Sequence, residues 1–140
     1  MFPIRTAPLA RATALTALLG SLALLSAAPA TASSGAPSGG SIVGTWTTRT
    51  DGVGQDVTFT RDGRVSGDAG CNRMMGTYTV DGSALDISTI ATTLMYCEGV
   101  MEAERTFLKA LEKSTAFSRD GKRLTLIAAS GRETLTLRRR

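Results

Sequence analysis

Short runs in which apolar and polar residues alternate occupy most of the chain from residue 42 onward, and this pattern predicts β-strands. Asp-Gly and Ser-Gly pairs separate many of these runs, as in β-hairpins, because glycine adopts positive φ angles without steric cost. We expect about eight strands, at 42–48, 56–60, 65–67, 76–80, 84–88, 115–119, 124–128 and 133–138. Strands this short and closely spaced favour a small antiparallel meander or barrel-like sheet.

One stretch, residues 98–114, has the periodicity of a helix instead of a strand. At about 100° per residue, its large apolar side chains fall on one face and most of its charged side chains on the other. The apolar face consists of Val100, Met101, Phe107, Leu108 and Leu111. We therefore expect one amphipathic helix packed on the sheet, which makes the fold class α+β and β-rich.

Glu104 breaks the pattern of this helix. It lies three residues before Phe107 and four before Leu108, so its side chain points into the apolar stripe. A buried carboxylate without partners is costly. Glu104 is therefore expected to be hydrogen-bonded, to be ion-paired, or to lie at the edge of the core.

The first 32 residues have the three parts of a secretory signal peptide. Arg5 and Arg11 precede an apolar stretch, and small residues before 33 offer cleavage sites between Ala30 and Ala32. The apolar stretch is interrupted and short for a membrane span. We expect a Ser/Gly/Pro linker at 33–41, one domain at 42–140, and a secreted protein that is soluble after cleavage, with no integral membrane segment in the mature chain.

Composition argues against several function classes. The chain has 16 basic and 12 acidic residues, and two of the basic ones lie in the expected signal peptide. The run Arg138–Arg140 has no interleaved aromatic residues, so we do not expect nucleic-acid binding. The chain has no histidine, so a serine or cysteine triad has no ordinary base. We expect no catalytic residues, no cofactor and a monomer.

Cys71 and Cys97 are the only cysteines of the chain. An even number of cysteines in an exported domain indicates a disulfide. A bridge closing this loop would contribute about 3.5 kcal/mol in the chain-entropy model. We expect the Cys71–Cys97 bridge and no metal site.

Two alternatives remain open at this level. Methionines cluster beside both cysteines, and thiolate and thioether ligands together suit Cu(I); the methionines are Met74, Met75, Met95 and Met101. Methionines in such positions also commonly fill irregular gaps in a core. The second alternative is a carrier that holds a small apolar ligand inside the barrel.

Three motifs together resemble the META domain family of HslJ-like heat-shock proteins. They are Gly-Cys-Asn-Arg with a following Gly-x-Tyr (70–78), Thr-x-Met-x-Cys (93–97) and Glu-x-x-Phe-Leu-x-x-Leu (104–111). The resemblance covers about residues 41 to 137. Tyr96 is a departure, because the family commonly has a small residue there.

The resemblance implies a compact β-rich fold with a packed helix in an exported or envelope protein linked to stress responses, without general enzymatic activity or cofactor. It also identifies Glu104 as the family's helix glutamate. From its central place on the apolar face of the helix, we expect Glu104 to reach the 70–76 loop and accept hydrogen bonds from backbone N–H groups, Asn72 or Arg73. The interpretation is a non-enzymatic exported binding module, linked to envelope or secretion stress, with an unidentified protein or small-molecule partner.

Overall fold

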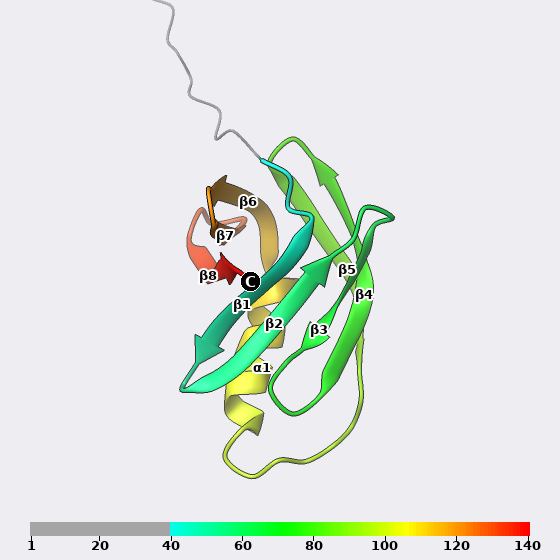
Figure 1. Cartoon of the computed structure of the whole chain (residues 1–140), viewed down its shortest axis with the longest axis vertical. Coiled ribbons are helices and arrows are strands. Elements are labelled where there is room, and N and C mark those ends of the chain that lie inside the picture. Colours follow the sequence, from blue (N-terminus) through cyan, green and yellow to red (C-terminus); the bar gives the residue numbers. More distant parts are fainter. Residues whose placement is uncertain (1–39) are drawn as a thin grey trace, which may run out of the picture. The chain divides into compact units, whose positions relative to one another are not determined.

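The computed structural model describes residues 40–140, which form a closed antiparallel barrel of eight strands and one helix (Figure 1). Each strand pairs with the next along the chain, and β8 pairs with β1. The elements are β1 (Gly44–Thr50), β2 (Val53–Phe59), β3 (Arg64–Asp68), β4 (Arg73–Asp81), β5 (Ala84–Thr92), α1 (Met101–Glu112), β6 (Ser114–Asp120), β7 (Arg123–Ala128) and β8 (Glu133–Arg139). The predicted β-rich α+β class is confirmed. The expected signal peptide, 1–32, and most of the expected linker lie outside the described residues.

The alternation of the sequence sets which side chains face the interior. In β2, Gln55, Val57 and Phe59 are buried while the residues between them are partly exposed. The β1–β2 hairpin turns through Asp51 and Gly52, which both have positive φ angles, 50° and 83°. Two positive φ angles define the turn type whose twist matches two-residue hairpins.

The helix is shorter than the predicted range 98–114, because it runs only from Met101 to Glu112. Gly99 has a φ angle of 75°, which a right-handed helix does not accommodate. At the other end Ser114 already begins β6, and its hydroxyl donates a hydrogen bond to the carbonyl of Ala110.

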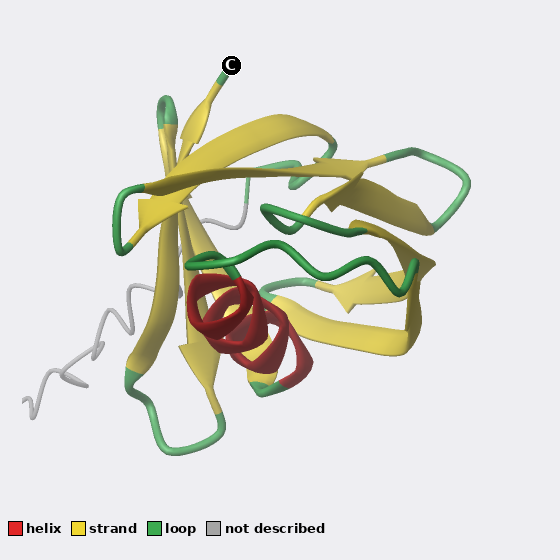
Figure 2. Ribbon diagram, turned by 90° about the horizontal axis from the view of Figure 1, so that it is seen from below, coloured by secondary structure: helices red, strands yellow, loops and turns green. Residues whose placement is uncertain are grey.

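Large side chains fill the interior of the barrel. The fully buried ones include Trp46, Phe59, Phe107, Phe117, Leu111, Leu124, Leu126 and Leu137. Two of these, Phe107 and Leu111, come from α1, which contacts β1, β5 and β8. Figure 2 shows the helix in the opening framed by the strands. The carrier alternative requires an open interior, and this packing gives it no support.

The helix contacts β5, and the pairing of β5 with β6 is the shortest strand pairing in the barrel. One register pair, Ala84 with Ala116, connects β5 to β6, and the backbone N–H of Phe117 donates to the carbonyl of Ser83.

Among residues 40–140 no helix combines the length and the apolar character needed to cross a bilayer.

Candidate functional site

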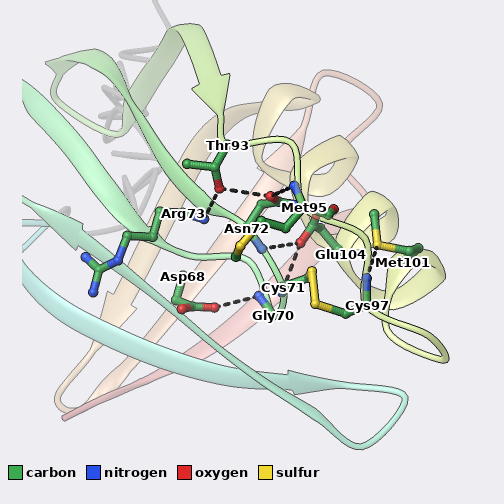
Figure 3. Close-up of a disulfide and its surroundings, with 10 residues drawn as sticks. All are labelled: Asp68, Gly70, Cys71, Asn72, Arg73, Thr93, Met95, Cys97, Met101 and Glu104. Atoms are coloured by element: carbon green, nitrogen blue, oxygen red, sulfur yellow. Dashed lines mark hydrogen bonds between the residues drawn. A yellow bond between two sulfur atoms is a disulfide. The ribbon is translucent and has the colours of Figure 1, made fainter.

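A disulfide joins two loops that are far apart in the sequence (Figure 3). Cys71 lies in the β3–β4 loop and Cys97 in the segment between β5 and α1, and their Cα atoms are 5.8 Å apart. The bridge is the one expected from the sequence. It fixes the segment that leads into the helix against the barrel.

Glu104 reaches from α1 to the β3–β4 loop, as its position in the apolar stripe predicted. Its Oε2 accepts hydrogen bonds from the backbone N–H groups of Cys71 (3.0 Å) and Asn72 (2.7 Å), and its Oε1 accepts one from Asn72 Nδ2 (2.8 Å). The residue is only 5% exposed. Burial alone raises the pKa of the Glu104 carboxyl, but the hydrogen bonds from Asn72 and Cys71 outweigh this effect and hold the pKa below its ordinary value.

Asn72 connects Glu104 to the segment between β5 and α1. Its Oδ1 accepts hydrogen bonds from the Thr93 hydroxyl (2.8 Å) and the Met95 N–H (2.7 Å). Its Nδ2 donates to the carbonyl of Met95 (3.0 Å) as well as to Glu104. All four hydrogen-bonding positions of this carboxamide are therefore used. Asn72 thus holds both the N–H and the carbonyl group of Met95.

Arg73 does not join this network through its side chain. The side chain is exposed, and no hydrogen bond or ion pair in residues 40–140 connects Arg73 to Glu104. The Arg73 backbone N–H donates to Thr93 Oγ1 instead (3.1 Å). Of the donors expected for Glu104, the structure uses backbone N–H groups and Asn72, whereas the Arg73 side chain is exposed at the start of β4.

Gln55 forms a second buried brace that sequence reasoning missed. Its Nε2 donates to the carbonyls of Ala69 (3.0 Å) and Ala103 (3.1 Å), and its Oε1 accepts from the Thr50 hydroxyl (2.7 Å). The β3–β4 loop is thereby tied to α1 independently of Glu104. The sequence feature that could have revealed this brace is a glutamine at an inward-facing position of β2.

These braces hold a loop that presents large apolar side chains to solvent. We define the apolar loop as Leu94, Met95 and Tyr96, which are 96%, 57% and 81% exposed. Single exposed apolar residues are common, but three consecutive large ones on a fixed backbone are not. Sequence reasoning assigned Met95 to a possible metal cluster and gave Leu94 no role.

The sulfur atoms do not come together as the Cu(I) site that the sequence left open as an alternative would require. Both thiols are consumed by the disulfide. Met74 is buried in the core, Met75 is 65% exposed, and Met101 Sδ accepts a hydrogen bond from the Cys97 N–H (3.4 Å). The part of the chain that the structure describes contains no group of three or more His, Cys, Asp or Glu side chains placed to hold a metal ion.

The barrel, the inserted helix and the bridged loops together define a class of small β-barrel domains stabilised by a disulfide. The META domain model matches residues 42–140, and the chain belongs to that family. No curated protein matches the chain.

Two solved structures share the fold. One, described as the NMR structure of the protein from Burkholderia xenovorans, is 24% identical, with a TM-score of 0.55 over 69% of this chain and 81% of that one. A second NMR structure is 21% identical, with a TM-score of 0.53 over 68% of this chain and 87% of that one. At these identities the similarity concerns the fold alone.

Proposed function

We propose that this META domain is a non-enzymatic exported module that binds a protein partner through the apolar loop. The observation that carries the proposal is the exposure of Leu94 and Tyr96 on a backbone fixed by Asn72 and the disulfide. A fixed loop loses little conformational entropy on binding, so more of its contact energy contributes to affinity. The matching surface on the partner is an apolar cleft.

The chemistry of the loop suits a protein interface. Tyrosine is among the residues that contribute most to binding energy when buried at an interface, and methionine adapts to irregular surfaces. The adjoining surface is polar and of mixed charge, because Arg73, Glu98 and the ion pair Arg105–Glu102 are exposed. A polar rim around an apolar centre is typical of specific interfaces.

The charges beside the loop give no net attraction to an anionic membrane, because exposed Glu98 and Glu102 balance exposed Arg73 and Arg105. Glu98 follows the apolar loop after Cys97, and Glu102 lies in the first turn of α1. Anionic membrane surfaces attract basic segments and repel carboxylates. The partner is therefore assigned as a protein, and lipid binding becomes an outcome of the test.

The non-enzymatic part of the proposal is supported by the chemistry of the residues. The chain has no histidine, both cysteines form the disulfide, and the carboxylate of Glu104 is occupied by three hydrogen bonds. Export is supported by the expected signal peptide, 1–32, and by the disulfide. The link to envelope or secretion stress comes from the family resemblance.

Site-specific crosslinking tests the proposal. We would place the photoreactive residue p-benzoylphenylalanine at position 96 in cells that secrete the protein, identify the crosslinked partner, and measure the Kd of the purified pair. We expect Leu94→Ser and Tyr96→Ser to raise the Kd by about 30-fold each, equivalent to about 2 kcal/mol. The matched control is Val80→Ser, since Val80 is 42% exposed but lies at the end of β4.

The proposal fails if the two loop variants bind the identified partner as tightly as the parent. It also fails if the only crosslinked species are lipids or second copies of this chain. Unchanged melting temperatures of the variants would show that the lost affinity does not come from unfolding.

A further inference from the structure

A hollow of about 710 Å³ opens on the surface where β1, β2, β3 and β8 meet. Its charged and hydroxyl-bearing lining includes Thr47, Arg49, Asp56, Asp68, Arg138 and Arg140. A smaller hollow of about 360 Å³ shares Asp56, Asp68 and Arg140 with it. The C-terminal end of β8 reaches this region beside β1 in Figure 1.

The strand register places the acidic and the basic side chains of the hollow on different strands. Asp56 on β2 lies directly opposite Asp68 on β3. Thr47 on β1 has Asp56 as its register partner on one side and Arg138 as its partner on the other. Arg138 and Asp56 are thus two strand spacings apart, about 10 Å between their backbones. Asp56 and Asp68 form the acidic wall of the hollow and Arg138 its basic wall, while Arg140 also lines the hollow and shares the smaller one with both carboxylates.

Neither wall is neutralised by the protein. The ion pairs found among residues 40–140 are Arg64–Asp62 and Arg105–Glu102, and neither involves the hollow. Asp68 Oδ1 accepts a hydrogen bond from the Gly70 N–H. Asp56 is half-buried and Arg138 is exposed, and no ion pair within residues 40–140 involves either side chain. Like charges directly opposite each other on neighbouring strands are destabilising. A bound cation would relieve the Asp56–Asp68 pair, and a bound anion would satisfy the arginines.

We propose that this hollow binds a short zwitterionic ligand, namely a peptide with a free amino and a free carboxyl end. The ammonium group lies against Asp56 and Asp68. The carboxylate lies against Arg138, whose planar guanidinium matches a carboxylate with two parallel hydrogen bonds. An extended tripeptide spans about 10 Å, a length similar to the backbone separation of Asp56 and Arg138. The inference is independent of the apolar loop.

Titration of the isotope-labelled domain with triglycine, followed by NMR, tests this site. We expect saturable shifts of the amide signals of Thr47 and Thr136, both of which line the hollow. N-acetyltriglycine lacks the ammonium group and triglycine amide lacks the carboxylate. Each should bind at least about tenfold more weakly, the loss expected for one charge-assisted hydrogen bond.

Two variants distinguish the walls. Asp56→Asn should weaken triglycine by about tenfold and leave N-acetyltriglycine unchanged. Arg138→Gln should weaken triglycine to a similar extent and leave triglycine amide unchanged. The matched controls are Asp86→Asn and Arg61→Gln, because both residues are exposed and neither lines the hollow.

The result that supports the proposal is binding that requires both charged ends and both walls. Absence of saturable shifts with triglycine overturns it, as does binding of either blocked peptide as tight as that of triglycine. Glycerophosphoethanolamine carries the same two charges closer together, as in a lipid headgroup. If it binds more tightly than triglycine, the assignment to a peptide is wrong.

Discussion

Asn72 and Glu104 form two hydrogen bonds with each other, one through the backbone N–H of Asn72 (2.7 Å) and one through its side chain (2.8 Å). The other hydrogen bonds of the Asn72 carboxamide hold Met95 and Thr93. A single buried pair therefore couples the helix to the apolar loop. The carboxylate of Glu104 positions the loop and is not itself presented to a ligand.

Removal of this carboxylate should destabilise the domain. Glu104→Ala leaves the N–H groups of Cys71 and Asn72 buried without an acceptor, and each unsatisfied group costs about 1–3 kcal/mol. We expect the free energy of unfolding to fall by about 3 kcal/mol in denaturant titrations. Glu112→Ala, at an exposed position of the same helix, is the control. Equal stability of Glu104→Ala and the parent would contradict the proposed brace.

The pH dependence of stability should report the same interaction. The pKa of Glu104 is lowered in the folded state, so this residue contributes stability that is fully present above its ordinary pKa of 4.5. That contribution is lost as the pH falls through the folded-state value. We expect the stability difference between the parent and Glu104→Gln to be largest at pH 7 and to shrink in acid. A difference that stays constant across urea titrations from neutral to acidic pH would rule out the charged carboxylate as the cause.

Loss of the disulfide should lower stability because the unfolded chain gains conformational entropy. The Cys71–Cys97 bridge closes a loop with a sequence separation of 26. In the chain-entropy model, the double variant Cys71→Ala/Cys97→Ala should lose about 3.5 kcal/mol of unfolding free energy. The intact mass of the unreduced domain should lie two hydrogens below that of the reduced chain. A reduced mass in protein purified without reductant would contradict the assignment.

Gly67 should tolerate no larger residue, because β2 and β3 approach each other closely there. A Cβ atom at this position would overlap the backbone carbonyl of Asp56, the residue before its register partner Val57 on β2. We expect Gly67→Ala to cost about 1–3 kcal/mol of stability, the range for overpacking. Gly54→Ala is the matched control, since a Cβ atom there meets no neighbouring atom. Similar melting temperatures for both variants would contradict the close approach.

The local patterns of the sequence were sufficient to predict eight strands in order, the apolar face of the helix, and a Glu104 that needs partners. They did not give every strand end, because β4 and β5 are nine residues long where the expected ranges were 76–80 and 84–88. Phe107 and Leu111 lie in the core as the helical periodicity indicated. The ends of the helix were less predictable, because the conformation of Gly99 depends on the bridge and turn beside it. Alternation and periodicity are local properties, and these predictions rest on local properties alone.

The apolar loop could not be predicted in the same way. Leu94 and Tyr96 are apolar or aromatic, so composition alone suggests burial, yet the structure exposes both. Their exposure follows from hydrogen bonds between Asn72 and Met95, which are 23 positions apart in the sequence. The hollow lined by Asp56, Asp68 and Arg138 likewise depends on strand register and on the pairing of β8 with β1, which no local pattern specifies.

The most direct test of the account is the backbone order of the apolar loop, measured by ¹⁵N relaxation at Leu94, Met95 and Tyr96. If Asn72, Glu104 and the disulfide fix this loop, its order parameters should be close to those of the strands, about 0.85. Values below about 0.6 would show a flexible loop and would contradict the claim that the domain presents a preformed binding surface.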